Sequence, residues 1–337
     1  MARRGEKRQW RNIVSSLGYV CSLAFVVLLV WRVGPSRLNA TFSNARPSAL
    51  LLGAITALLG WVLVATKWRA VLRSLGSSRP IARLLSLTLA SQLWGLLLPV
   101  PFSDELYRGG QLAASDTPLG VIARAAFLDR VTTLVVTAVL GLCAAILNRS
   151  AMLDERLIAT LAAAAAAPFL GYVLLRRPVF ARFALSPVRR VLPPARFQEV
   201  EHGVAWLLAH PGALLVFLGL AAGGQLVFVA AMTEWAQGLG VPLSVEQIAW
   251  AMLASALVPY LLPLPGMSII VQQGSFVYLL VAMGATTDQA GAVSLSSLAL
   301  LVLFGAAGAL WEVGRTLVGR KWPRVHKDGL AGNGVTR

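Results

Sequence analysis

Two short stretches decide the fold: Leu97-Leu98-Pro99-Val100-Pro101 and Leu261-Leu262-Pro263-Leu264-Pro265. Each lies near the middle of a long apolar segment, 84–115 in the first case and 248–284 in the second. Proline has no backbone N–H and clashes with the preceding turn, so a helix ends or kinks at each stretch. Non-helical backbone at membrane depth is tolerated only where protein or a water-filled cavity covers it. We therefore predict that both segments are re-entrant hairpins, which enter and leave the membrane on the same side.

The composition of the chain is that of a membrane protein. Of its 337 residues, 57% are hydrophobic and 13% are charged, whereas soluble domains have about 45–50% apolar and about 25% charged residues. This excludes an ordinary cytosolic enzyme. Outside the hairpins, the runs long enough to cross a bilayer, which takes about 20 residues, are 13–31, 48–66, 121–147, 157–175, 212–233 and 290–314. We predict an all-α polytopic membrane protein with six full spans and two proline-broken re-entrant hairpins.

The basic residues predict the orientation. With a cytoplasmic N-terminus, the inner segments 1–12, 67–83, 176–211 and 315–337 hold 5, 5, 6 and 6 Lys and Arg residues, 22 in total. The outer segments 32–47, 148–156 and 234–247 hold 3, 2 and 0, or 5 in total. Cytoplasmic loops collect these residues, so both termini are predicted to be cytoplasmic and the chain to lie in the cell membrane. The first apolar run is interpreted as a retained helix, because no small-residue cleavage site of a signal peptide follows it.

The predicted organisation has five parts. A basic cytoplasmic N-terminus is followed by a first membrane half, a basic cytoplasmic linker, a second membrane half and a cytoplasmic tail, at 1–12, 13–175, 176–211, 212–318 and 319–337. The linker has two interpretations. It anchors the protein to anionic lipids through its cations, or it docks an acidic partner such as a lipid-modifying enzyme.

The two hairpin segments align when Pro99 is placed on Pro263. Ala90-Ser91 then falls on Ala254-Ser255, Pro101 falls on Pro265, and Gly110 falls on Gly274. The charge topology places the first hairpin on the cytoplasmic side and the second on the outer side, so the halves are predicted to form an inverted repeat. Paired interruptions of this kind point to a transporter binding site. The alternative is a coincidence between two stretches rich in leucine and proline.

Three cations, Arg108, Arg124 and Arg130, fall outside the loops counted above. Ionisable groups at membrane depth are costly and usually mark a substrate path. The alternative for each is a structural role, and Arg124 in particular can reach the cytoplasmic surface from the end of its span. Carboxylates lie near Arg108 and Arg130, and Asp129 is expected to pair with another element because adjacent helical residues do not face each other. The candidate residues of the first half are Asp104, Glu105, Tyr107, Arg108, Asp129 and Arg130.

The second hairpin is chemically different. It presents Ser268, Gln272 and Gln273, with Gln272 in the place of Arg108. The first hairpin can therefore supply charge to an anionic head group, and the second only neutral hydrogen bonds. We predict that Pro99, Pro101, Pro263, Pro265, Gly110 and Gly274 form the structural hinges.

These features resemble the integral membrane domain of lysylphosphatidylglycerol synthases, a family that also includes stand-alone flippase-like proteins. The resemblance covers roughly residues 13–318 and rests on Lys67-Trp68-Arg69, Pro99 to Arg108, Asp129-Arg130 and Pro263 to Gly274 with Phe276. Family members typically carry an Arg-Glu pair before the second glycine, where this chain has Gln272-Gln273. In the synthases this domain is thought to flip the aminoacylated lipid that a separate soluble domain makes. The resemblance implies a lipid translocator without a synthase domain.

No catalytic constellation is found in the sequence. Cys21 and Cys143 lie in apolar runs, and His202, His210 and His326 lack metal-ligand spacing. There is no nucleotide-binding motif, which disfavours ATP-driven transport by this chain. We expect neither an enzyme nor a cofactor, and no nucleic-acid partner. The leading hypothesis is translocation of an anionic or zwitterionic phospholipid or polyprenyl-phosphate lipid, with Arg108 and Arg130 binding the phosphate. The alternatives are a small-solute or ion permease, and a non-transporting scaffold for a lipid-modifying enzyme or a glycosyltransferase.

Overall fold

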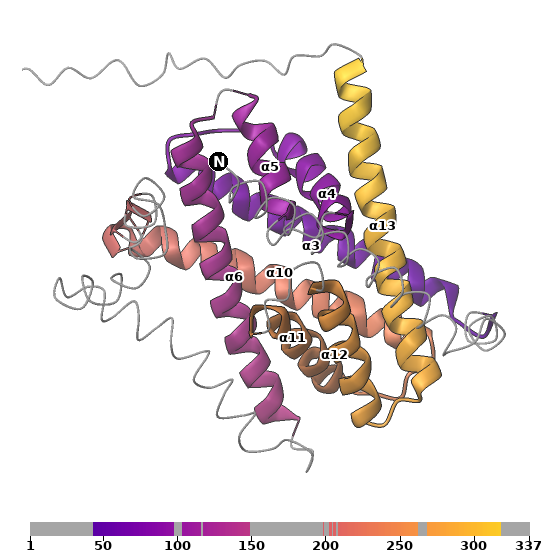
Figure 1. Ribbon diagram of the computed structural model, residues 1–337. Helices are drawn as coiled ribbons and strands as arrows, with labels where there is room; N and C mark the ends of the chain where they lie inside the picture. Colours follow the sequence, from indigo (N-terminus) through magenta and orange to yellow (C-terminus); the bar gives the residue numbers. More distant parts are fainter. Residues whose placement is uncertain are drawn as a thin grey trace, which may run out of the picture.

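The computed structural model describes residues 43–97, 103–115, 117–148, 198, 202–203, 205–206, 208–261 and 268–317. Within these ranges the chain forms eight main helices (Figure 1). The predicted spans 13–31 and 157–175, the four prolines of the two Pro-x-Pro stretches, most of the linker 176–211 and the tail 319–337 lie outside the described residues.

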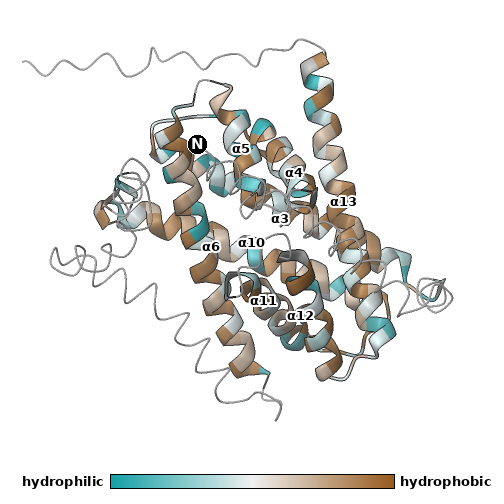
Figure 2. Cartoon of the chain, viewed as in Figure 1, coloured by the Kyte–Doolittle hydropathy of each residue, from teal (hydrophilic) through white to brown (hydrophobic). Residues whose placement is uncertain are grey.

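Four helices are long and apolar enough to cross a membrane: α3 (Pro47–Ser74), α6 (Leu119–Leu147), α10 (Pro211–Gly238) and α13 (Thr287–Leu317). They coincide with four of the six predicted spans. Their outer faces are apolar (Figure 2), and side chains such as Leu51, Leu215 and Leu310 are 63%, 70% and 72% exposed. Lipid is the medium in which such faces are stable, so the chain is a multi-pass membrane protein.

The two segments with proline breaks each form a pair of short helices. Helices α4 (Ile81–Leu97) and α5 (Ser103–Ala113) pack on each other, as do α11 (Val245–Leu261) and α12 (Ser268–Ala282). The helices of each pair lie on either side of a Pro-x-Pro stretch that is itself outside the described residues, so the interruption by proline stays a prediction. The entry of these hairpins into the membrane from opposite sides stays a prediction.

Two pairs of helices share their boundaries between the halves. In the alignment that places Pro99 on Pro263, α3 and α10 begin and end at matching positions, and so do α4 and α11. Proline starts both α3 and α10, where a helix needs no N–H donor. Gly76 and Gly240, at φ +80° and +74°, follow their last turns. The N–H of Ser77 donates to Leu72 and that of Val241 to Ala236, at 2.8 and 3.0 Å, which is the hydrogen bonding of a Schellman motif.

The two halves exchange their short helices. Helix α3 packs along α10, while α4 packs against α13 and α11 against α6, so each hairpin contacts a long helix of the other half (Figure 1). At Gly308 the approach of α13 to α4 is so close that a Cβ atom would lie 2.6 Å from the Cβ of Leu89. The halves are therefore one interlocked bundle, and a movement of one hairpin involves a long helix of the other half.

Candidate functional site

The first hairpin resumes at a group of charged side chains. Asp104, in the first turn of α5, accepts a hydrogen bond from Arg108 at 3.0 Å and one from Arg130 of α6 at 3.2 Å. Glu105 forms an ion pair with Nε of Arg130. Arg108 and Asp104 are one helical turn apart and share a face of α5. The structure thus brings together four of the residues that the sequence predicted as a site.

Arg108 is held on two sides. Its side chain is 6% exposed, and its guanidinium carbon lies 4.7 Å from the centre of the Trp68 ring of α3. A guanidinium over an indole face is attracted by the negative charge of the ring face, and the attraction is stronger away from water. The ring of Tyr107 stacks on that of Trp94 of α4, and the two ring centres are 5.5 Å apart. Arg108 is therefore fixed in orientation by Asp104 and Trp68, and Tyr107 joins α5 to α4.

Asp129 pairs with another element, as expected. Its Oδ1 lies 2.7 Å from Nζ of Lys67 on α3, and the two side chains are 9% and 4% exposed. Lys67 also donates to the hydroxyl of Thr133, at 2.5 Å. We refer to Lys67, Asp104, Glu105, Arg108, Asp129 and Arg130 as the charged cluster.

Lys67 was not predicted as a site residue, because the charge count assigned it to a cytoplasmic segment. In the structure α3 continues through Ser74, since no helix breaker occurs before Gly76. Lys67 therefore points from the helix into the bundle. The only signal in the sequence was its place in the Lys67-Trp68-Arg69 motif that carries the family resemblance.

Arg83 was likewise counted as a loop residue, but it lies in α4 and is buried. It forms an ion pair with Glu312 of α13, which also accepts a hydrogen bond from Ser86 at 2.5 Å and pairs with Arg315 at 3.2 Å. This ion pair joins the first hairpin to the last long helix. Arg124, by contrast, lies in the second turn of α6 and donates to the carbonyl of Gly120, at 3.1 Å.

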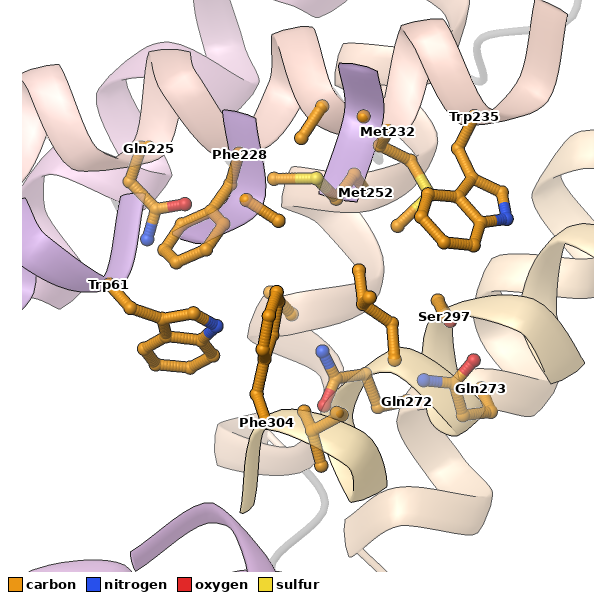
Figure 3. A pocket seen from close by; sticks show the side chains of 16 residues that line it. Trp61, Gln225, Phe228, Met232, Trp235, Met252, Gln272, Gln273, Ser297 and Phe304 are labelled. Carbon is orange, nitrogen blue, oxygen red and sulfur yellow. The ribbon is translucent and has the colours of Figure 1, made fainter. Parts of the chain in front are cut away.

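The predicted residues of the second hairpin lie in a different place. Gln272 and Gln273 line a cavity of about 270 Å³ between α3, α10, α11, α12 and α13 (Figure 3). We call it the amide cavity, because Gln225 of α10 also lines it. Gln273 accepts a hydrogen bond from Ser294 at 2.7 Å, and Gln225 donates to Thr137 at 3.1 Å. Among the described residues, those that line this cavity include no charged side chain and no member of α5.

The remaining predicted residues have simpler positions. Ser268 begins α12, and its side chain is outside what the structure describes. Gly110 and Gly274 lie inside α5 and α12 rather than at the breaks, and a Cβ atom at Gly110 would meet no atom within 4 Å. The predicted site residues lie in two places, the charged cluster and the amide cavity. A single cleft formed by both hairpins stays a prediction. No group of three or more His, Cys, Asp or Glu side chains that could hold a metal ion occurs among the described residues.

One family of known proteins matches the chain. The sequence model described as the lysylphosphatidylglycerol synthase TM region matches residues 15–309, a range that contains both the charged cluster and the amide cavity. No curated protein matches the sequence.

Proposed function

The chain belongs to the lysylphosphatidylglycerol synthase TM-region family, and on this premise we propose that it moves the head group of an anionic or zwitterionic lipid between the leaflets of the cell membrane. The proposal includes that it does so without catalysing a reaction and without a cofactor. The acyl or polyprenyl tails would stay in the surrounding lipid, so the protein needs to cover only the head group.

The charged cluster is the observation that carries this proposal. Six ionisable side chains lie on α3, α5 and α6, where each charge costs about 2.5–3.5 kcal/mol on membrane-insertion scales. A buried ion pair is weak evidence for a stabilising role, because apolar residues of similar volume often stabilise a protein as well or better. Ionisable groups inside a membrane protein are instead typical of a substrate or ion path.

The geometry supports binding of a phosphate. Arg130 and Asp104 are 26% and 23% exposed, so an anion can reach the edge of the cluster. A guanidinium binds a phosphate through two parallel hydrogen bonds, as it binds a carboxylate. A phosphate would therefore replace the Asp104 or Glu105 carboxylate on Arg130 and then on Arg108. The displaced carboxylates would orient the arginines or carry protons, so that a lipid gradient or proton movement drives transport.

We also propose that the two halves form an inverted repeat. The support is the matching boundaries of α3 with α10 and of α4 with α11, the matched Pro and Gly at the ends of α3 and α10, and the contacts of α4 and α11 with long helices of the other half. In transporters built this way, the halves rock around a central site and open it to one side at a time. The positive-inside distribution supports cytoplasmic termini.

Lipid translocation can be measured with purified protein in liposomes that contain fluorescent phospholipids, with dithionite added outside to destroy the accessible fluorophore. Without translocation, the fluorophores of the inner leaflet are protected from dithionite. Wild-type protein should bring them to the outer leaflet, so that their fluorescence is lost as well, and Arg108→Gln should not. Arg46→Gln is the matched control, because Arg46 is exposed just before α3. Gel filtration and thermal unfolding establish that each variant is folded.

Normal translocation by a folded Arg108→Gln variant would contradict the role of the charged cluster. No translocation of any head group by folded wild-type protein would favour the other two functions instead. Uptake of a soluble substrate regardless of lipid type would indicate a permease. Loss of an enzyme's activity on truncation of the 176–211 linker would indicate a scaffold.

A further inference from the structure

The amide cavity has the lining of a binding site for an uncharged polar group. Aromatic rings from three helices surround it, and Trp61 and Phe228 meet edge to face at 4.9 Å (Figure 3). Carboxamides of α10 and α12 supply its polar groups. Ligand sites are typically concave and mostly apolar, with a few polar groups that fix the orientation of the ligand.

Several of these polar groups have no partner among the described residues. The Gln272 carboxamide, the amide nitrogen of Gln273, the carbonyl oxygen of Gln225 and the indole N–H of Trp61 make no hydrogen bond there. Figure 3 shows the Gln272 amide directed toward Phe304 and the amide nitrogen of Gln273 directed toward Gln272. All four side chains are half-buried, so a ligand in the cavity can reach their unpaired groups. The cavity therefore offers both donors and an acceptor to a ligand.

The matching positions of the first half carry larger or charged side chains. The alignment of the two halves relates Met232, Ala231, Gln272 and Ser297 of the cavity to Trp68, Lys67, Arg108 and Thr133. There the Arg108 guanidinium covers the Trp68 ring and Lys67 bonds to Thr133. The second half thus has smaller, uncharged side chains at positions where the first half has an indole and charged groups. The cavity is the counterpart of the charged cluster.

We propose that the amide cavity binds an uncharged, hydroxyl-rich ring, the sugar head group of a glycolipid; this inference rests on the proposed lipid translocation and names a substrate class for it. The C–H faces of a sugar ring pack on the negative faces of aromatic rings. Its hydroxyls donate and accept, as carboxamides do. A phosphate would be held by cations, and the cavity lining contains none among the described residues. The volume of about 270 Å³ equals that of roughly nine waters at about 30 Å³ each, which suits a single ring and not a whole lipid.

The test measures binding separately from transport. The full chain is placed in phosphatidylcholine nanodiscs with a photoactivatable monoglucosyl diacylglycerol, and the crosslinking yield is followed against probe concentration. A phosphatidylglycerol probe with the same reactive group serves as the comparison. We expect the glucosyl probe to label α12 or α13 at lower concentrations than the phosphatidylglycerol probe, and unlabelled glucosyl lipid to compete.

Three variants locate the site. Gln272→Leu keeps the size of the side chain but removes its amide. It should weaken the binding of the glucosyl probe about tenfold, which corresponds to about 1.4 kcal/mol. Ala256→Phe fills the cavity and should abolish labelling. Leu303→Phe on the same helix as Phe304 is the control, because Leu303 is 62% exposed to lipid, and it should label as wild type does. If Ala256→Phe does not fold, the near-isosteric Gln272→Leu still decides the question.

The outcomes separate the two proposals. Equal labelling by both probes, or unchanged labelling in the folded Gln272→Leu variant, would overturn the sugar site. Specific labelling without dithionite-detected translocation of any lipid would support the site and refute the transport function. Translocation that requires Arg108 but shows no preference for the glucosyl lipid and no effect of the cavity variants would support transport and refute this inference.

Discussion

The Lys67–Asp129 pair allows the strongest test of why the charged cluster exists. Its side chains are 4% and 9% exposed, and the pair joins α3 to α6. Changing Lys67→Met alone leaves a buried carboxylate without its cation, which should lower the free energy of unfolding by about 3–5 kcal/mol. The change also removes the hydrogen bonds of Lys67 to the Thr133 hydroxyl and the Asp129 carbonyl, while Thr133 would still donate its hydroxyl to that carbonyl, at 2.7 Å.

The double variant Lys67→Met/Asp129→Leu replaces the pair with apolar side chains of similar volume. Such replacements are often neutral, or stabilising by about 1–4 kcal/mol. We therefore expect the double variant to be more stable than Lys67→Met and close to wild type, with a coupling energy of at least about 2 kcal/mol from the double-mutant cycle. If the pair serves transport, the double variant is folded but translocates no lipid.

The assay is reversible unfolding in mixed micelles of a mild detergent and sodium dodecyl sulfate, followed by near-ultraviolet circular dichroism, with translocation measured on the same preparations. Thr66→Val is the matched control, because this residue adjoins Lys67 on α3 and its hydroxyl bonds only to the helix backbone, at Val62, among the described residues. Ordinary surface changes alter the free energy of unfolding by at most about 0.5 kcal/mol. If Lys67→Met changes it by no more than that, Lys67 and Asp129 are not a buried pair in which each charge depends on the other. A stable double variant with wild-type translocation would show that the pair is not needed for transport.

Three further changes test the contacts between the halves and the lining of the cavity. Glu312→Gln removes the carboxylate that pairs with both Arg83 and Arg315. It should lower the free energy of unfolding by about 3 kcal/mol in the same micelle titration. Gly308→Ala places a methyl group against the backbone of α4 and should cost more than about 1–3 kcal/mol, because backbone cannot give way as a side chain does. Gly314→Ala on the same helix meets no atom within 4 Å and should stabilise the protein by up to about 1 kcal/mol, because alanine favours a helix more than glycine does. Gly60→Ala brings a Cβ to 2.7 Å from the Phe228 ring, so the ring must move, and glucosyl crosslinking should fall while stability changes by only about 1 kcal/mol.

The sequence was sufficient to predict four long helices and the segments that form the shorter apolar helices, because their signals are local. Apolar length sets a span, and Pro-x-Pro interrupts a helix wherever it lies. The Asp104–Arg108 pair was also predictable, since an interval of four residues on a helix brings side chains together. These predictions needed no knowledge of which helix packs against which.

What the sequence could not predict depends on long-range packing. Counting charges assigned Lys67 and Arg83 to a loop, because a cation near the end of an apolar run is compatible with either a loop or a continuing helix. Their partners, Asp129 and Glu312, lie on helices that follow much later in the chain, α6 and α13. The amide cavity was hidden for the same reason, since it forms where five helices meet and small side chains leave room.

The charge balance of the described site connects its two parts. Lys67, Arg108 and Arg130 match Asp104, Glu105 and Asp129, so the charged cluster is neutral as it stands, and the lining of the amide cavity is neutral as well. A phosphate that enters the cluster adds a negative charge that no cation of the cluster is left to balance. At membrane depth such a charge costs about 2.5–3.5 kcal/mol, unless a displaced carboxylate takes up a proton. A sugar in the amide cavity adds no charge and needs no such compensation. If the chain translocates lipids as proposed, we expect an anionic head group to move together with a proton or another cation and an uncharged one to move without it. The net charge of the substrate would then decide whether transport is coupled to protons.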